Sequence, residues 1–149
     1  MGRLEVEVET KSGADKFWEA IKDTTNLFPK LFPDRYKSVE ILEGDGKSAG
    51  SVILMNYIAG TPPVTFSKER IDEADEAKKS IAYTVIDGEL TAIYPTFKAS
   101  LQVVPKGDGS VVKWALDYVK ASEEVPEPSF IKEYAVKTFE GLDAYIQKA

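Results

Sequence analysis

The residues best suited to chemistry gather first in a glycine-rich stretch, residues 43–51, which reads EGDGKSAGS. Gly44, Gly46 and Gly50 permit a tight turn, and the backbone N–H groups that such a turn exposes can face an anion or a partner. In a P-loop, four residues separate the first glycine from the Gly-Lys-Ser element and a helix follows. Here Gly46 comes two residues after Gly44 and a strand-like run follows, so we interpret the stretch as a hairpin turn.

The chain has no cysteine and no histidine, which removes the usual nucleophilic thiol, the usual neutral-pH base and the commonest metal ligands. Any catalysis would use carboxylates, lysine or tyrosine with shifted pKa values. The acidic run 72–76 lacks the alternating ligand spacing of a calcium loop and is typical of a solvated turn. We therefore expect no metal, no cofactor and no catalytic residue.

Length and charge narrow the class of protein further. The chain has 149 residues, of which 43% are apolar, so we expect one domain over residues 1–149. The net charge of -6 argues against nucleic-acid binding, which needs a basic surface. No run approaches the ~18 apolar residues of a membrane helix, and charge appears early at the N-terminus. We expect a cytoplasmic monomer without stable membrane insertion.

Hydrophobic periodicity predicts the elements that position these residues. Leu4, Val6 and Val8 alternate with glutamates, as in a strand with one buried face. Ser12 is in the position to cap a helix over roughly 13–23, and segment 27–33 contains two prolines that allow only short helical turns. Further strands are predicted at 36–42, 51–59, 64–71, 80–86, 96–104 and 110–120, followed by a helix of about five turns that begins near Ser129.

Turn signals at 61–63, 73–76, 87–89 and 106–109 separate these strands. The order is strand, two short helices, six strands and a long helix. The long amphipathic helix is the one large partner available to the apolar face of the sheet. The sequence therefore predicts an α+β helix-grip fold, in which a curved seven-stranded antiparallel sheet wraps around the C-terminal helix.

Side-chain alternation predicts which residues face the interior. Lys113 and Asp117 belong outside the last strand, and Lys68, Glu69 and Arg70 are typical of a solvated strand end. The inward residues are also our candidates for contacting a ligand: Phe28, Leu31, Ile53, Met55, Tyr57, Val64, Phe66, Ile81, Tyr83, Val85, Phe97, Ala99, Leu101, Trp114, Leu116, Tyr118, Ile131, Tyr134, Ala135, Thr138 and Leu142.

This predicted interior is rich in hydroxyl groups, which Tyr57, Tyr83, Tyr118, Tyr134 and Thr138 carry. A buried hydroxyl without a partner costs about 1 to 3 kcal/mol. In one interpretation the hydroxyls reach the rim, water or backbone carbonyls. In the other they are polar contacts inside a cavity with apolar walls, which suits an amphipathic small molecule.

The sequence resembles the major latex protein branch of the birch-pollen-allergen family, within the START-like superfamily. The likeness covers essentially the whole chain, and the order and spacing of its motifs make it specific. The motifs are LFPK at 27–30, SVE at 38–40, EGDG at 43–46, KER at 68–70, YTVIDG at 83–88 and GDGS at 107–110. Allergen-type members have a denser glycine loop than the one at Gly44, Gly46 and Gly50.

The resemblance implies a plant cytosolic protein whose sheet and long helix enclose a cavity for hydrophobic ligands. It implies a role in defence or stress, and ligands proposed for the family include flavonoids, cytokinins, sterols and fatty acids. A ribonuclease activity reported for some relatives has been attributed to a lysine after the glycine loop and to glutamates in a later strand and the last helix. The corresponding regions here, 53–54, 94–96 and Asp143, largely lack them.

Three functions remain open at this point. The first is a carrier or sensor that holds an apolar small molecule in the cavity. The second is an enzyme that works inside the cavity without a metal, although the predicted inward set contains no lysine, aspartate or glutamate. The third is an interaction protein that presents the glycine-rich loop to a partner, with its negative charge steering it toward a basic surface.

Overall fold

The computed structural model describes residues 2–58 and 61–148. The elements follow in the order β1 (Gly2–Thr10), α1 (Ala14–Lys22), α2 (Thr24–Leu31), β2 (Tyr36–Glu43), β3 (Val52–Ile58), β4 (Thr61–Asp75), β5 (Ser80–Gly88), α3 (Glu89–Ile93), β6 (Thr96–Lys106), β7 (Gly109–Val119) and α4 (Ser129–Lys148). The predicted seven strands, two short helices and long final helix are confirmed. The predicted strand end at Ala59 lies outside the described residues.

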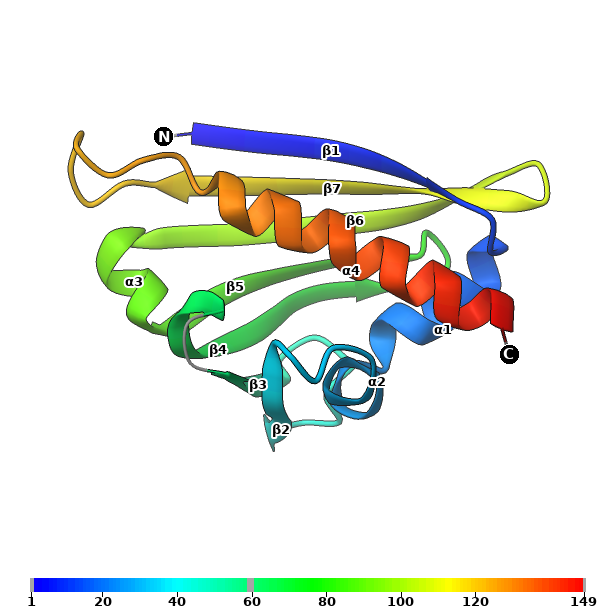
Figure 1. Cartoon of the computed structure of the whole chain (residues 1–149), viewed down its shortest axis with the longest axis horizontal. Helices are drawn as coiled ribbons and strands as arrows, with labels where there is room; N and C mark the ends of the chain where they lie inside the picture. The colour runs from blue at the N-terminus through cyan, green and yellow to red at the C-terminus, as the bar shows by residue number, and fades with distance from the viewer. Residues whose placement is uncertain (1, 59–60, 149) are drawn as a thin grey trace.

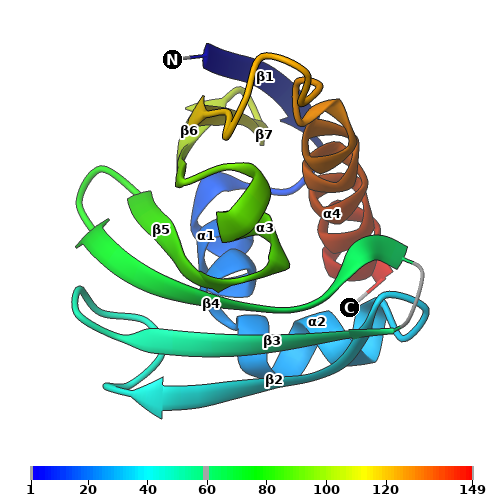
Figure 2. The same ribbon diagram turned by 90° about the vertical axis from the view of Figure 1, so that its left-hand side faces the viewer.

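The strands form one antiparallel sheet in the order β1-β7-β6-β5-β4-β3-β2. The first strand therefore pairs with the last, and β2 forms the opposite edge. Bulges interrupt the pairing of β4 with β5 and of β2 with β3, and bulges bend and twist a strand. Figure 2 shows the resulting curved sheet around α4, which supports the predicted helix-grip architecture.

Helix α4 crosses the concave face of the sheet, with α1 and α2 near its C-terminal end and α3 near the opposite end of the molecule (Figure 1). It buries Thr138, Phe139 and Leu142 against the core. The predicted inward set of β7 is confirmed, since Val112, Trp114, Leu116 and Tyr118 are all at most 3% exposed. No helix in the part of the chain that the structure describes is long and apolar enough to cross a membrane.

Two contacts fix the position of α4. The Asp143 carboxylate accepts hydrogen bonds from the backbone N–H groups of Lys11 and Ser12, at 3.1 and 3.0 Å, and from the Ser12 hydroxyl. The predicted role of Ser12 as a helix cap is therefore wrong: Gly13 occupies the N-cap position, and the Ser12 side chain holds α4 instead. Further along the helix, the Phe32 ring fills the space over Gly141, where a Cβ would lie 2.6 Å from it.

The structure differs from two of the predicted turns, at 73–76 and at 87–89. Strand β4 continues to Asp75, through most of the predicted turn at 73–76, and the predicted turn at 87–89 begins the short helix α3. Gly88 allows this sharp change of direction because its φ of +113° is unfavourable for residues with a side chain. The Glu89 carboxylate then accepts hydrogen bonds from the backbone and hydroxyl of Thr65, which attaches α3 to β4.

We expect the substitution Gly88→Ala to lower the free energy of unfolding by about 2 to 4 kcal/mol. A Cβ at this position would lie 2.4 Å from the carbonyl oxygen of Phe66 and would add the cost of the positive φ. The control is Gly107→Ala, where φ is +60° but no atom lies within 4 Å, so only about 1 kcal/mol should be lost. Urea unfolding measures both, and equal losses would contradict the prediction.

Candidate functional site

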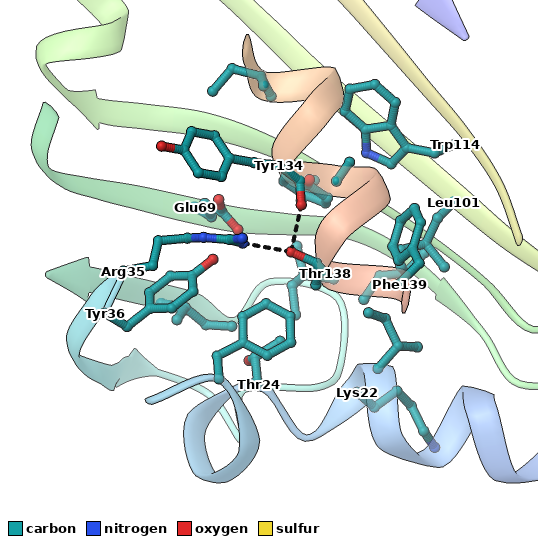
Figure 3. A pocket seen from close by; sticks show the side chains of 18 of the residues that line it. Lys22, Thr24, Arg35, Tyr36, Glu69, Leu101, Trp114, Tyr134, Thr138 and Phe139 are labelled. Atoms are coloured by element: carbon teal, nitrogen blue, oxygen red, sulfur yellow. Dashed lines mark hydrogen bonds between the residues drawn. The ribbon is translucent and has the colours of Figure 1, made fainter. Parts of the chain in front are cut away.

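A cavity of about 160 Å³ lies between the concave face of the sheet, α2 and α4 (Figure 3). Its volume exceeds that of a few water molecules, so α4 does not fill the concave face. Carbon atoms dominate its walls. The lining residues are Ile21, Lys22, Thr24, Phe28, Arg35, Tyr36, Gly46, Ile53, Tyr57, Glu69, Ile71, Ile81, Tyr83, Leu101, Trp114, Ile131, Tyr134, Ala135, Thr138 and Phe139.

The structure brings about half of the predicted ligand-contacting set to this wall. These residues come from strands β3, β5, β6 and β7 and from helices α2 and α4: Phe28, Ile53, Tyr57, Ile81, Tyr83, Leu101, Trp114, Ile131, Tyr134, Ala135 and Thr138, together with Gly46 of the glycine-rich loop. The remaining predicted residues do not line the cavity: Leu31, Met55, Val64, Phe66, Val85, Phe97, Ala99, Leu116, Tyr118 and Leu142, with Gly44 and Gly50.

Close packing explains why Phe97 and Tyr118 do not line the cavity. The Tyr94 ring lies 5.9 Å from the rings of both Phe97 and Tyr118, and its hydroxyl donates to the carbonyl of Pro126. Tyr94 follows α3, the helix that the sequence did not predict, and is 1% exposed. The end of the concave face near α3 is therefore filled by side chains, and the cavity occupies the end near α2.

The sequence predicted that Phe66 faces the interior and that Glu69 is solvated. Both predictions are wrong because the alternation of inward and outward side chains shifts within β4. Val64 is buried, but so are Ser67 and Ile71, which lie an odd number of residues further on. Glu69 shares the face of Ser67 and Ile71, whereas Phe66 is half-buried and lies outside the core cluster. The predicted solvated strand end therefore describes Lys68 and Arg70 but not Glu69.

Glu69 is the most unusual group in the cavity. It lies opposite Ile53 on β3 and Val85 on β5, both buried residues of the inner face. No described residue donates a hydrogen bond to its carboxylate or forms an ion pair with it. Burial alone raises the pKa of this carboxyl group to about 7, because the ionised form loses its hydration.

Arg35 supplies a positive charge to the same cavity. Its Nη1 donates to the Thr138 hydroxyl at 2.7 Å, and Thr138 in turn donates to the Tyr134 carbonyl (Figure 3). The guanidinium carbon lies 4.5 Å from the ring centre of Tyr134 and 4.9 Å from that of Phe32. These stacked rings hold the guanidinium group in a fixed plane against α4.

The hydroxyl groups of the cavity wall largely have protein partners. Tyr57 shares a hydrogen bond of 2.8 Å with Ser67, and Trp114 interacts with the hydroxyl of Tyr83. Burial raises the pKa of Tyr36 to about 12 and raises the pKa values of Tyr57 and Tyr83 as well. The tyrosines therefore remain neutral at physiological pH.

The glycine-rich loop does not offer an empty anion site. The Asp45 carboxylate accepts hydrogen bonds from the backbone N–H groups of Lys47 and Ser48 at 2.8 and 2.7 Å, and from the Ser48 hydroxyl. These bonds hold the pKa of Asp45 well below its ordinary value. The loop's own aspartate thus occupies the donors that a phosphate would need. Among the described residues, no group of three acidic side chains forms a metal site either.

Residues 1–149 match the model of the pathogenesis-related protein Bet v 1 family. The chain belongs to this family. The Bet v 1 family binds hydrophobic ligands, and this structure has a largely apolar cavity behind α4.

Relatives place the chain among the major latex proteins of the Bet v 1 family. It is 46% identical to MLP-like protein 423 of Arabidopsis thaliana over 147 residues, which cover 99% of this chain and 95% of the relative. The crystal structure of ginseng major latex-like protein 151 from Panax ginseng has a TM-score of 0.87 and 27% identity, with 97% and 96% of the two chains covered. The predicted family and fold are therefore confirmed.

Enzymes also share this Bet v 1 fold. Norcoclaurine synthase from Thalictrum flavum has a TM-score of 0.83 and 22% identity, and the likeness covers 99% of this chain and 87% of that one. At this identity the likeness concerns the fold alone.

Several lining residues were absent from the sequence prediction, namely Ile21, Lys22, Thr24, Arg35, Tyr36, Glu69, Ile71 and Phe139. The period of two between side chains on one strand face would have placed Glu69 inside, because Glu69 lies two residues before the buried Ile71. Arg35 directly precedes β2, where no periodic signal indicates which way a side chain points. Lys22 lines the cavity with its stem, while its ammonium group pairs with Glu19 and Glu76.

We expect Glu69→Gln to change how stability depends on pH. The folded protein binds the Glu69 proton more tightly than the unfolded chain, since burial raises its pKa from 4.5 to about 7. Wild-type stability should therefore fall relative to that of the variant as pH rises through this interval, by up to about 3 kcal/mol. Urea unfolding at several pH values measures the difference.

The control for this series is Glu73→Gln, which removes an exposed carboxylate from the same strand. Its stability should follow that of the wild type at every pH. A constant difference between wild type and Glu69→Gln from about pH 4.5 to about pH 8 would contradict a raised pKa in the folded state.

Proposed function

We propose that this protein binds small amphipathic molecules in the cavity behind α4, as a carrier or sensor. The observation that supports the proposal is the Glu69 carboxyl group, which is held among apolar side chains without a protein partner. Burying such a group without a hydrogen bond is costly. A ligand that carries a hydroxyl or amino donor on an apolar body would supply the missing partner.

The volume of the cavity limits the size of the ligand. About 150 Å³ is enough for one benzene ring, and the cavity measures about 160 Å³. The norcoclaurine synthase structure contains dopamine and hydroxybenzaldehyde, which are single-ring molecules. We therefore propose a single-ring ligand for the conformation described here. Sterols, flavonoids and fatty acids, which the resemblance suggested, would require α2 and α4 to move apart.

Catalysis inside the cavity is the second candidate function, and Glu69 is the observation that favours it. A general acid or base works best when its pKa lies near the working pH, and burial brings the pKa of Glu69 to about 7. The expectation that the protein is not an enzyme rested partly on an inward set without carboxylates, and Glu69 changes that premise. Recovery of chemically altered ligand after incubation with wild type, but not with Glu69→Gln, would support this function over binding alone.

The remaining parts of the function stay predictions. They are a role in plant defence or stress, a cytoplasmic location, a monomeric state and a possible protein partner. A partner surface has one structural argument in its favour: Ile41 and Leu42, next to the glycine-rich loop, are 42% and 46% exposed.

Filling the cavity should abolish binding while the fold survives. Ala135 lines the cavity from α4, so Ala135→Leu places three additional carbon atoms in the empty space. We expect wild type to be stabilised by about 2.7 kcal/mol at a ligand concentration of one hundred times Kd, and the variant to show no stabilisation. A thermal-shift panel of phenols, aromatic acids, aromatic amines, sterols and fatty acids measures this.

Ala144→Leu provides the matched control, since Ala144 is exposed on the same helix. It should bind as wild type does. The proposal fails if no compound in the panel stabilises the wild type, or if Ala135→Leu binds the active compounds as tightly as the wild type.

A further inference from the structure

We infer that the cavity selects a single-ring carboxylic acid that also carries a hydroxyl or amino group, with Arg35 binding the carboxylate and Glu69 accepting the donor. This inference rests on the proposed function, because it names the class of ligand that the same cavity takes. It follows from the arrangement of Arg35 and Glu69, which both lie on the largely apolar cavity wall but do not form an ion pair with each other.

Arg35 has the geometry of an anion-binding group, because protein contacts hold its guanidinium group in place and leave part of its edge unused. Among the described residues no carboxylate lies within ion-pair distance of its guanidinium group, which has five N–H donors. One donor is used by Thr138 at 2.7 Å, and a second lies within reach of the Tyr36 hydroxyl. Thr138 donates its own proton to the Tyr134 carbonyl, so it can only accept from Arg35. Donors on the edge of the guanidinium group remain for a ligand.

The aromatic rings around Arg35 make the site directional. Tyr134 and Phe32 contact the guanidinium group at 4.5 and 4.9 Å, which desolvates it and fixes its plane. A fixed planar guanidinium group matches a carboxylate through two parallel hydrogen bonds. Water hydrates this face poorly, so a bound carboxylate gains more there than at an exposed arginine.

The second end of the ligand is set by Glu69. Arg35 interacts with the Tyr36 hydroxyl, and Glu69 also acts on this hydroxyl electrostatically, so the three groups belong to one region of the cavity. Figure 3 shows the three side chains on the same side of α4. A ligand that spans this region meets donors at the Arg35 end and an acceptor at the Glu69 end. Apolar side chains such as Ile53, Leu101 and Trp114 complete the wall for the ring.

The cavity also tolerates the negative charge of the ligand. The cations that line it are Arg35 and Lys22, and Lys22 is already paired with Glu19 and Glu76. Glu69 is the anion of the wall, and its raised pKa keeps a substantial fraction of it neutral near pH 7. A carboxylate that binds to Arg35 therefore meets limited repulsion from Glu69.

Three soluble probes test the inference by isothermal titration calorimetry: 4-hydroxyphenylacetate, its neutral amide, and phenylacetate, which lacks the hydroxyl. Wild type should bind 4-hydroxyphenylacetate at least about tenfold more tightly than the amide, since hydrogen bonds between a guanidinium group and a carboxylate are roughly twice as strong as those to a neutral acceptor. It should also bind 4-hydroxyphenylacetate more tightly than phenylacetate, and Glu69→Leu should remove this second preference.

Arg35→Gln should bring the acid-to-amide ratio close to one and leave the affinity for the amide unchanged. Arg35→Lys keeps the charge without the planar fork and should retain part of the preference, which covers the case in which the glutamine variant folds poorly. The matched control is Lys30→Gln, which removes an exposed cation that lies over the Tyr145 ring outside the cavity. This control should bind all three probes as wild type does.

Equal affinity of wild type for the acid and the amide would overturn the inference and leave the proposed function standing. An equal loss of both affinities in Arg35→Gln would also overturn it, because Arg35 would then only support the fold. If none of the three probes binds and the wider panel also fails, the proposed function falls together with the inference.

Discussion

Helix α4 is about 10 Å wide with its side chains, whereas seven strands about 4.8 Å apart make a sheet about 29 Å wide. A single helix therefore cannot cover the concave face of this sheet. The chain fills the remaining space unequally. Near α3 the aromatic rings packed around Tyr94 fill the space between helix and sheet. Near α2 this space is not filled and forms the cavity. The site exists because one end of the interior is packed and the other is not.

The two charged side chains in the open half contribute little to stability. Glu69 and Arg35 both lie on the cavity wall, yet they do not form an ion pair with each other. A partly buried charge without a partner lowers the stability of the protein, and a complementary ligand would restore that stability on binding. The neutral tyrosines, by contrast, are mostly satisfied within the protein and serve as walls. If the cavity binds the proposed ligand, its selectivity would depend mainly on these two side chains.

The sequence was sufficient to predict the fold because its signals are local and repeated. Alternation identified the strands, the Asp-Gly turn near residue 108 separated the last two, and helical spacing identified α4. The same approach failed where the pattern changes within an element. The shift between Val64 and Ser67 concealed Glu69, and Gly88 appeared as a simple turn although it begins α3. Arg35 lies outside any periodic segment, so its direction depended on tertiary contacts with Thr138 and Tyr134.

The contact between Phe32 and Gly141 links access to the cavity with the state of Arg35. The Phe32 ring lies over the bare backbone of α4 at Gly141, and another side of the ring supports the guanidinium group. Any outward swing of α2 that carries Phe32 away from α4 removes this support. The guanidinium group of Arg35 would then be more hydrated and more mobile, and its affinity for an anion would fall. The movement of α2 that opens the cavity would therefore also weaken the binding of a charged ligand by Arg35.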